Sequence, residues 1–244
     1  MGTFKMKIAG YVGEITSLFE STSAYFRPYL TEDTADFAFT VTGEHLRFED
    51  RFLLEEAKEE GFKVRKFTDP FLERQAIQRA FAEFLLPRNV ILLHGSTVAL
   101  DGTAYLFTAR SGTGKSTHTR LWREYFGSRA QMVNDDKPFL SISREGVTAH
   151  GAPWSGKHGL DSNISVPLGG ICLLERGSEN WIRPMAAEEI LDMLRHQSFH
   201  SRDPAMEEKL EALLLELTRL VPLWNMHCTK DPAVARVAYE AMSK

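Results

Sequence analysis

The sequence has few cysteines, no long apolar stretch and no excess of basic residues. Only Cys172 and Cys228 occur among the 244 residues, too far apart for the spacing of a metal-binding motif. Because structural disulfides belong mainly to exported proteins, this cysteine usage predicts a reduced protein of the cytoplasm. No apolar run approaches the roughly 18 residues that a membrane-spanning helix needs, and the first residues lack the apolar segment of a signal peptide. We therefore expect no membrane partner.

The charge balance excludes a second class of function. Acidic residues outnumber basic ones by 33 to 29, which gives a net charge of −4. A general nucleic-acid-binding protein shows a basic excess instead, so we expect no nucleic-acid partner. Apolar residues make up 43% of the chain and charged residues 25%, a composition that can bury a sizeable core.

The first 88 residues show strand and helix patterns without a recognisable catalytic motif. Residues 37–42 alternate bulky apolar side chains with small or polar ones, as a half-buried strand does. Asp69 and Pro70 are typical of a helix start, and apolar residues at helical spacing follow until Pro87. We predict that residues 1–88 form a mixed α+β segment packed on a second domain, residues 89–244.

The pattern changes at residue 89. Residues 90–93 are an apolar run typical of a buried strand, and Asp101-Gly102 is the signal of a tight hairpin turn before a strand at residues 104–108. Helical spacing then runs from Leu121 to a stop at Gly127. An apolar run at residues 171–174 predicts a central strand, and leucines at helical spacing in residues 210–220 predict a helix.

A glycine-rich loop with the sequence SGTGKST lies between the predicted strand 104–108 and the helix after it. Gly112 and Gly114 allow backbone conformations in which N–H groups surround phosphate oxygens. In such a P-loop (Walker A) motif Lys115 contacts the β- and γ-phosphates, and the Ser116 hydroxyl coordinates Mg²⁺. The usual first glycine is Ala109 here, the smallest replacement. We predict a nucleotide site formed by Ser111, Gly112, Thr113, Gly114, Lys115, Ser116 and Thr117.

Two adjacent aspartates, Asp135 and Asp136, follow this loop at the expected end of a strand. One carboxylate of such a pair can hold Mg²⁺, and the other can take the proton of an attacking hydroxyl. Neighbouring side chains of an extended segment point to opposite faces, so the two carboxylates cannot occupy the same position. A surface turn is the alternative, because Asn and Asp favour turns.

Together these motifs resemble the catalytic domain of HPr serine kinase/phosphorylase, a family that shares its nucleotide fold with phosphoenolpyruvate carboxykinases. The resemblance covers roughly residues 89–180, where His94-Gly95, the hairpin, SGTGKST and the aspartate pair occur in the same order. It implies a mixed α/β fold with a P-loop core of this type, mostly antiparallel, and ATP and Mg²⁺ as ligands. It also implies homo-oligomers, a base at Asp135, a Mg²⁺ ligand at Asp136, and active-site positions for His94, Lys115 and Ser116.

Other residues are weaker candidates. Lys157 and His158 lie in a loop rich in Gly and Pro, and they could contact the γ-phosphate or an anionic acceptor; a solvated loop is the alternative. His118 is predicted to lie on a helix surface; a position close to the phosphate or metal is the alternative. Candidates for a clamp on the transferred phosphoryl group are Arg110, Arg120, Arg123, Arg176 and Arg183.

The sequence thus predicts an ATP- and Mg²⁺-dependent kinase that transfers the γ-phosphoryl group to a hydroxyl. The second aspartate favours this interpretation, because a simple nucleotide switch does not need it. A non-catalytic ATP-binding regulatory protein and a carboxykinase-like enzyme are the alternatives. A serine of a protein or peptide and a small-molecule hydroxyl fit the residues equally well as acceptors.

Overall fold

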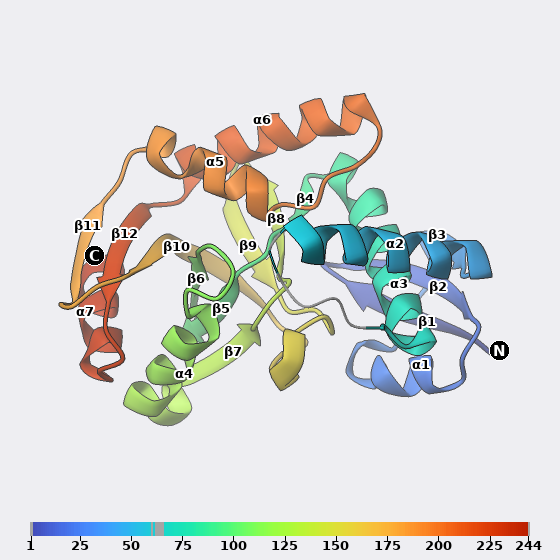
Figure 1. Ribbon diagram of the computed structural model, residues 1–244, viewed down its shortest axis with the longest axis horizontal. Helices are drawn as coiled ribbons and strands as arrows, with labels where there is room; N and C mark the ends of the chain where they lie inside the picture. The colour runs from blue at the N-terminus through green and yellow to red at the C-terminus, as the bar shows by residue number, and fades with distance from the viewer. Residues whose placement is uncertain (1, 60, 62–65, 244) are drawn as a thin grey trace. The chain divides into compact units, whose positions relative to one another are not determined.

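The computed structural model describes residues 2–59, 61 and 66–243, and the chain divides into two units, residues 1–84 and 85–244. Each unit combines helices with a sheet of its own (Figure 1), which confirms the predicted mixed α/β class. Within the described residues, no helix has both the length and the apolar character needed to cross a membrane.

The described part of the first unit contains a three-stranded sheet with the order β1 (Gly2–Ile8), β2 (Tyr11–Ser17), β3 (Phe37–Thr40). Strands β1 and β2 form an antiparallel hairpin, and β3 runs parallel to β2. Ala9 and Gly10 form the hairpin turn with φ of 50° and 87°, the positive values that a two-residue turn of this kind requires. Strand β3 lies where the alternation of residues 37–42 predicts a strand.

Three helices complete this unit: α1 (Ser21–Tyr25), α2 (Gly43–Glu59) and α3 (Asp69–Leu85). Helix α3 begins at Asp69 itself, because the N–H groups of Phe71 and Leu72 bond to the carbonyl of Thr68. Phe81 of α3 and Phe37 of β3 pack over Gly13, where an added Cβ would lie 2.8 Å from each ring. This close approach explains a glycine in the middle of β2.

The described part of the second unit contains a nine-stranded mixed sheet with the path β4-β8-β9-β10-β6-β5-β7, to which β12 adds beside β10 and β11 beside β12. Its strands are β4 (Val90–Leu92), β5 (Ser96–Leu100), β6 (Thr103–Thr108), β7 (Ala130–Asn134), β8 (Phe139–Ser143), β9 (Gly146–His150), β10 (Ser165–Arg176), β11 (Trp181–Pro184) and β12 (Leu223–Cys228). Most neighbours are antiparallel, but β10 runs parallel to both β6 and β12. The predicted hairpin joins β5 and β6, with Asp101 and Gly102 at φ of 51° and 83°.

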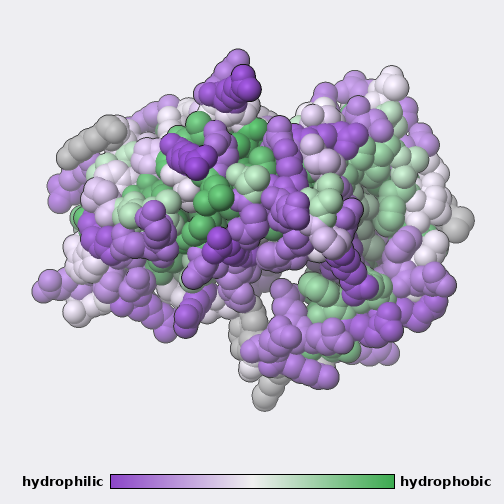
Figure 2. All heavy atoms as spheres, turned by 90° about the horizontal axis from the view of Figure 1, so that it is seen from above, coloured by the Kyte–Doolittle hydropathy of each residue, from purple (hydrophilic) through white to green (hydrophobic). Residues whose placement is uncertain are grey.

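Helices cover both faces of this sheet (Figure 1): α4 (Lys115–Phe126), α5 (Ala187–Gln197), α6 (Pro204–Leu220) and α7 (Ala233–Met242). Leu106 of β6 belongs to the core beneath α5 and α6, whereas its neighbours Tyr105 and Phe107 belong to the core beneath α4 and α7. Both faces of the strand are therefore buried, as is typical of a strand in a sheet that helices cover on both sides. The face that carries α5 and α6 shows mostly hydrophilic residues with hydrophobic patches between them (Figure 2).

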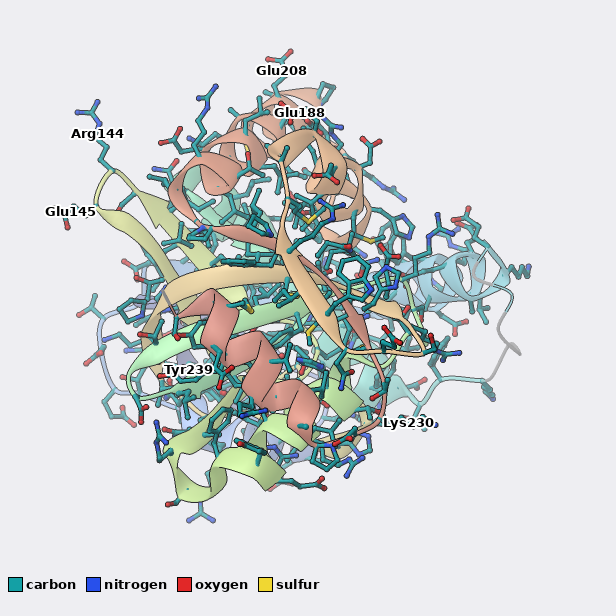
Figure 3. All side chains as sticks on the ribbon, turned by 90° about the vertical axis from the view of Figure 1, so that its left-hand side faces the viewer. Arg144, Glu145, Glu188, Glu208, Lys230 and Tyr239 are labelled. Atoms are coloured by element: carbon teal, nitrogen blue, oxygen red, sulfur yellow. The ribbon has the colours of Figure 1, made fainter. Side chains whose placement is uncertain are left out.

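Helix α7 is held against α4 by aromatic contacts. The ring of Tyr239, labelled on α7 in Figure 3, stands edge-on to the rings of Tyr105, Trp122 and Phe126, with centroids 6.0, 6.0 and 5.3 Å away. Edge-to-face pairs at these distances stabilise packing beyond the area they bury. Helix α7 thus anchors α4, which follows the glycine-rich loop.

Candidate functional site

Sheet topology brings three separate segments to one edge. Strand β5 is antiparallel to both β6 and β7, so the carboxyl ends of β6 and β7 meet beside the start of β5. Ser96 at that start pairs with Phe107 near the end of β6, and Thr97 pairs with Asn134 at the end of β7. The predicted site segments follow directly: residues 94–95 before β5, the glycine-rich loop after β6, and residues 135–136 after β7.

The glycine-rich loop, residues 111–117, has the backbone conformations that its glycines allow, and its last three residues form the start of α4. Gly112 and Gly114 have φ of 74° and 123°, values that residues with a side chain rarely adopt. Gly114 is the N-cap of α4 and has no side chain to cap it, so the first N–H groups of the helix remain available to an anion. Arg176 of β10 braces the loop, because its guanidinium donates to the carbonyls of Gly112 and Thr113 at 2.6 and 3.3 Å.

Lys115 and Ala109 are both buried at the base of this loop. The Lys115 side chain folds back so that Nζ donates to the carbonyl of Ala109 at 3.2 Å. Ala109 is fully buried in the core that contains Phe107. Its φ is not positive, so an alanine fits here without the strain that a positive φ would impose.

Asn134 shapes the turn that carries the two aspartates. Its Oδ1 accepts hydrogen bonds from the backbone N–H groups of Asp136 and Lys137 at 2.7 and 2.6 Å. Its Nδ2 donates to the carbonyl of Ala152 at 2.6 Å. A side chain that replaces backbone partners in this way fixes a tight turn, and here it also ties that turn to the segment 152–161.

Asp135 is buried and connected to α4. The Ser96 hydroxyl donates to Asp135 Oδ1 at 2.7 Å and lies 2.7 Å from the Thr119 hydroxyl. Because the proton of Ser96 is used on the carboxylate, Thr119 supplies the proton of the second bond. The Asp135 N–H donates to the carbonyl of Leu160 at 3.0 Å. The carboxylate is thus held directly by β5 and indirectly, through Ser96, by α4, while the segment 152–161 holds the Asp135 backbone.

Asp136 points to a different partner, His94. The distance from His94 Nε2 to Asp136 Oδ1 is 3.1 Å. Burial, together with the charges of Lys137 and Lys115, lowers the pKa of His94 more than its bond with Asp136 raises it. Burial opposes ionisation of Asp136, but the hydrogen bond from His94 and the two lysines outweigh it and hold the pKa of this carboxyl below its usual value. A neutral imidazole therefore donates to a carboxylate.

One open cleft of about 530 Å³ brings most of the predicted residues together. From the glycine-rich loop and α4 it is lined by Ser111, Gly112, Gly114, Lys115, Ser116, Thr117, Arg120 and Arg123; from the other segments by His94, Asp135, Asp136, Lys157, His158 and Leu160. Thr113 lies instead on a neighbouring cleft of about 450 Å³, which shares Gly112, Gly114 and Thr117 and reaches Lys230 after β12 (Figure 3).

His118 does not lie on the helix surface, so that prediction was wrong. Its side chain is 2% exposed, and its ring packs 4.3 Å from that of Phe107. Nε2 accepts a hydrogen bond from Trp122 Nε1 at 3.1 Å, and burial lowers the pKa of His118 to about 3. The apolar face of α4 is wider than its leucine and tryptophan indicate, and it takes in this neutral histidine.

The five candidate arginines lie in different surroundings, and not all of them reach the cleft. Arg120 and Arg123 line the cleft, Arg176 braces the loop, and Arg183 pairs with Glu189 at 2.6 Å. Arg110 is exposed and does not line the cleft. The structure therefore leaves two arginines of α4 as candidates for contact with substrate.

Several residues that shape the site have no signal in the sequence. Ser96, Asn134 and Thr119 act through hydrogen bonds between distant segments, and only a knowledge of strand pairing could have identified them. Within the described residues, no group of three or more His, Cys, Asp or Glu side chains could hold a metal ion. Any Mg²⁺ here would need oxygen ligands from the nucleotide and water as well.

No protein-family model and no curated protein sequence matches the chain. Among solved structures, the chain is similar to the HPr(Ser) kinase/phosphatase from Coxiella burnetii, with a TM-score of 0.38 and 11% sequence identity. This similarity covers 62% of the present chain and 95% of the other. A similarity of this size does not determine a reaction, so the case for function depends on the geometry of the cleft.

Proposed function

We propose that this protein is an ATP- and Mg²⁺-dependent kinase that transfers the γ-phosphoryl group to a hydroxyl acceptor. The observation that supports it most is the shared cleft: the glycine-rich loop at the start of α4 and two differently partnered aspartates line the same space. Phosphoryl transfer needs positioning, neutralisation of phosphate charge and a proton acceptor. In the cleft, the glycine-rich loop would position the phosphates, Lys115 would neutralise their charge, and Asp135 would accept the proton.

In this proposal residues 111–117 form the phosphate loop. Their N–H groups and the N-terminus of α4 would bind the phosphate oxygens, and Lys115 would exchange the carbonyl of Ala109 for the β- and γ-phosphates. The neighbouring cleft, which shares Gly112, Gly114 and Thr117 with the first, gives the nucleoside a place at the other end of the triphosphate.

The donor set fits Mg²⁺ bound together with a nucleotide. Such an ion keeps waters and phosphate oxygens and takes only one or two protein ligands, and we assign these to the Ser116 hydroxyl and the Asp136 carboxylate. The lowered pKa of Asp136 supports this assignment, because a carboxyl that stays ionised is a ready ligand for a cation. When bound, the ion would neutralise negative charge on the phosphates.

Asp135 is assigned as the proton acceptor. Ser96 holds its Oδ1, and Asp135 lines the same cleft as Ser116. In the transfer the acceptor oxygen bonds to the γ-phosphorus, the bond from that phosphorus to the β–γ bridging oxygen breaks, the acceptor proton passes to Asp135, and ADP leaves. His94 supports the step by fixing the orientation of Asp136.

The wider organisation belongs to the same proposal. Residues 89–244 would be the nucleotide-binding domain, residues 1–88 an accessory segment, and the active form a homo-oligomer in the cytoplasm. The acceptor is a protein or peptide serine or a small molecule.

Labelled ATP separates this function from its alternatives. We would incubate the protein with Mg²⁺, γ-³²P-ATP and native cell lysate, and follow the label by gel electrophoresis and thin-layer chromatography. A kinase gives label on a protein or small alcohol that Lys115→Ala abolishes. Lys209→Ala, on α6 and outside the cleft lining, should leave this label unchanged. Tight ATP binding without transfer would contradict the kinase and favour a regulatory protein; dependence of transfer on an oxaloacetate-type acid would favour a carboxykinase-like enzyme.

A further inference from the structure

One face of α4 carries positive charge beyond the phosphate loop. Ser116, Arg120 and Arg123 are spaced i, i+4 and i+7, so they lie on the same face, and all three line the cleft. At 1.5 Å per residue, the backbone of Arg123 is about 10 Å further along the helix axis than that of Ser116. The cleft therefore continues along α4 past the position proposed for the phosphates.

Arg123 is left without a partner in this arrangement. Its Nε is buried and has no hydrogen-bond partner, and within the part of the chain that the structure describes its guanidinium takes part in no ion pair. Arg120, by contrast, is paired with Glu124 one turn along the helix. Buried charged donors are ordinarily satisfied, so an unsatisfied one in an open cleft indicates a missing anion.

Another part of the cleft wall carries the positive charge of Lys157. Lys157 and His158 belong to the short 3₁₀ helix Gly156–His158, and neither side chain has a hydrogen bond or ion pair to any of the described residues. The segment is anchored at both ends: Ser155 Oγ donates to Asp161 at 2.6 Å, and Asp135 N–H donates to the carbonyl of Leu160.

Gly156 sets how closely this wall approaches the aspartates. Its φ is 68°, and an added Cβ would lie 3.2 Å from the Cβ of Asp136. A residue with a side chain would be strained by this φ and crowded by Asp136. The glycine thus lets the backbone next to Lys157 lie directly against the aspartate turn.

We propose that the cleft binds an anionic acceptor: a hydroxyl compound whose carboxylate or phosphate group is held by Arg123 and Lys157 while its hydroxyl faces Asp135. This inference rests on the proposed kinase function and adds the chemical class of the acceptor. An arginine fork matches two oxygens of either group, and the lysine adds a point charge. Among the described residues that line the cleft, Asp135 and Asp136 are the only acidic ones, and both already have roles in the proposed transfer.

Matched pairs of acceptors test this proposal. The carboxylate pair is N-acetyl-L-serine and N-acetyl-L-serinamide; the phosphate pair is glycerol 3-phosphate and glycerol. We expect kcat/KM for the anionic member of one pair to exceed that of its neutral partner by at least about tenfold, as one charge-assisted contact predicts. The pair that shows the preference identifies the anionic group.

Variants of Arg123 distinguish a role in acceptor binding from a role on the transferred phosphoryl group. Arg123→Gln should reduce the ratio of kcat/KM between the anionic and the neutral acceptor to about one, chiefly by raising KM for the anionic acceptor. The affinity for Mg·ATP and the slow hydrolysis of ATP should not change. Arg123→Lys should restore part of the preference, since the charge remains and the fork is lost. Arg144→Gln removes the same charge at the exposed β8–β9 turn (Figure 3) and should leave the preference intact.

Three results would overturn the proposal. The first is equal use of both members of each pair. The second is an equal loss of transfer to all acceptors and of ATP hydrolysis in Arg123→Gln, which would place Arg123 on the phosphoryl group instead. The third is the absence of binding and transfer for both anionic probes while calorimetry shows bound Mg·ATP, which leaves the nucleotide site standing. If ATP itself does not bind, the kinase function fails, and this inference fails with it.

Discussion

Replacing Asp135 by asparagine tests the chemical core of the proposed mechanism. Asparagine keeps the size of the side chain and an oxygen that can accept the hydrogen bond of the Ser96 hydroxyl. In the parent protein this hydroxyl lies 2.7 Å from Asp135 Oδ1. Asparagine cannot take a proton from an acceptor hydroxyl. We therefore expect a folded protein that binds Mg·ATP nearly as the parent does and transfers phosphate slowly.

The size of the effect follows from the role. A positioned general base contributes typically 10²–10⁴-fold to a rate, so kcat for Asp135→Asn should fall at least about a hundredfold, or roughly 2.7 kcal/mol in the barrier. The assay is the initial rate of label transfer at saturating Mg·ATP, using the acceptor that the lysate experiment identifies. Calorimetry of Mg·ATP binding should give a dissociation constant within about threefold of the parent value, or 0.7 kcal/mol.

Asp136→Asn serves as the contrast. A ligand of Mg²⁺ is lost, so the concentration of Mg²⁺ that gives half-maximal rate should rise, and excess Mg²⁺ should recover part of the activity. Asp192→Asn, on the exposed side of α5, is the control and should behave as the parent, since its ion pair with Arg195 lies at the surface. Full activity in Asp135→Asn, with loss in Asp136→Asn that does not depend on Mg²⁺, would reverse the two roles. Full activity in both variants would refute the mechanism.

Three further predictions use other parts of the site. Lys115→Ala should abolish transfer and weaken ATP binding in calorimetry with circular dichroism unchanged; unchanged affinity would refute the phosphate loop. Ala109→Gly should change ATP affinity by less than about 1 kcal/mol, because the methyl group lies in the core and φ is not positive; a larger gain would show a distorted loop. In the folded protein His118 stays neutral until the pH falls to its pKa of about 3. In the unfolded chain the same histidine takes up a proton below about pH 6.5. The stability that neutral His118 contributes is therefore present above pH 6.5 and is lost as the pH falls toward 3. Between pH 7 and 5 the parent should lose about 2 kcal/mol more unfolding free energy in urea titrations than His118→Gln; equal losses would contradict the buried neutral histidine.

Local features of the chain were predictable because they depend on neighbours in sequence. The Asp101-Gly102 turn needs positive φ at both positions, and few residue pairs other than Asp-Gly or Asn-Gly accept it. The glycine-rich loop between a buried strand and an amphipathic helix is another such feature. Periodicity likewise located α3 and α6.

Features that depend on pairing across the sheet were not predictable. The apolar run 171–174 indicates a buried strand but not that β10 extends from Ser165 to Arg176, nor that it lies parallel to both β6 and β12. The burial of His118 depends on α4 packing on β6, and the roles of Ser96 and Thr119 depend on β5 lying between β6 and β7. Hydrophobic patterns show that a surface is covered, but they do not show by which element.

The site divides into groups that the fold holds and groups that it leaves free. His94 is fixed by its N–H bond to the carbonyl of Gln197 at the end of α5, and the Thr108 hydroxyl donates to its carbonyl. The aspartates are held by Ser96, His94 and the Asn134 turn. Groups fixed in this way by strands and helix ends are suited to chemistry that requires constant geometry.

Arg123, Lys157 and His158 differ, because each reaches the same cleft without a partner among the residues that the structure describes. Substitution at these three positions breaks no hydrogen bond that supports the aspartates, so it should change which acceptor binds without changing how phosphate moves. The proposed nucleotide chemistry and the proposed choice of acceptor thus depend on separate sets of side chains, and an acceptor preference can shift by substitutions on α4 and residues 156–158 alone.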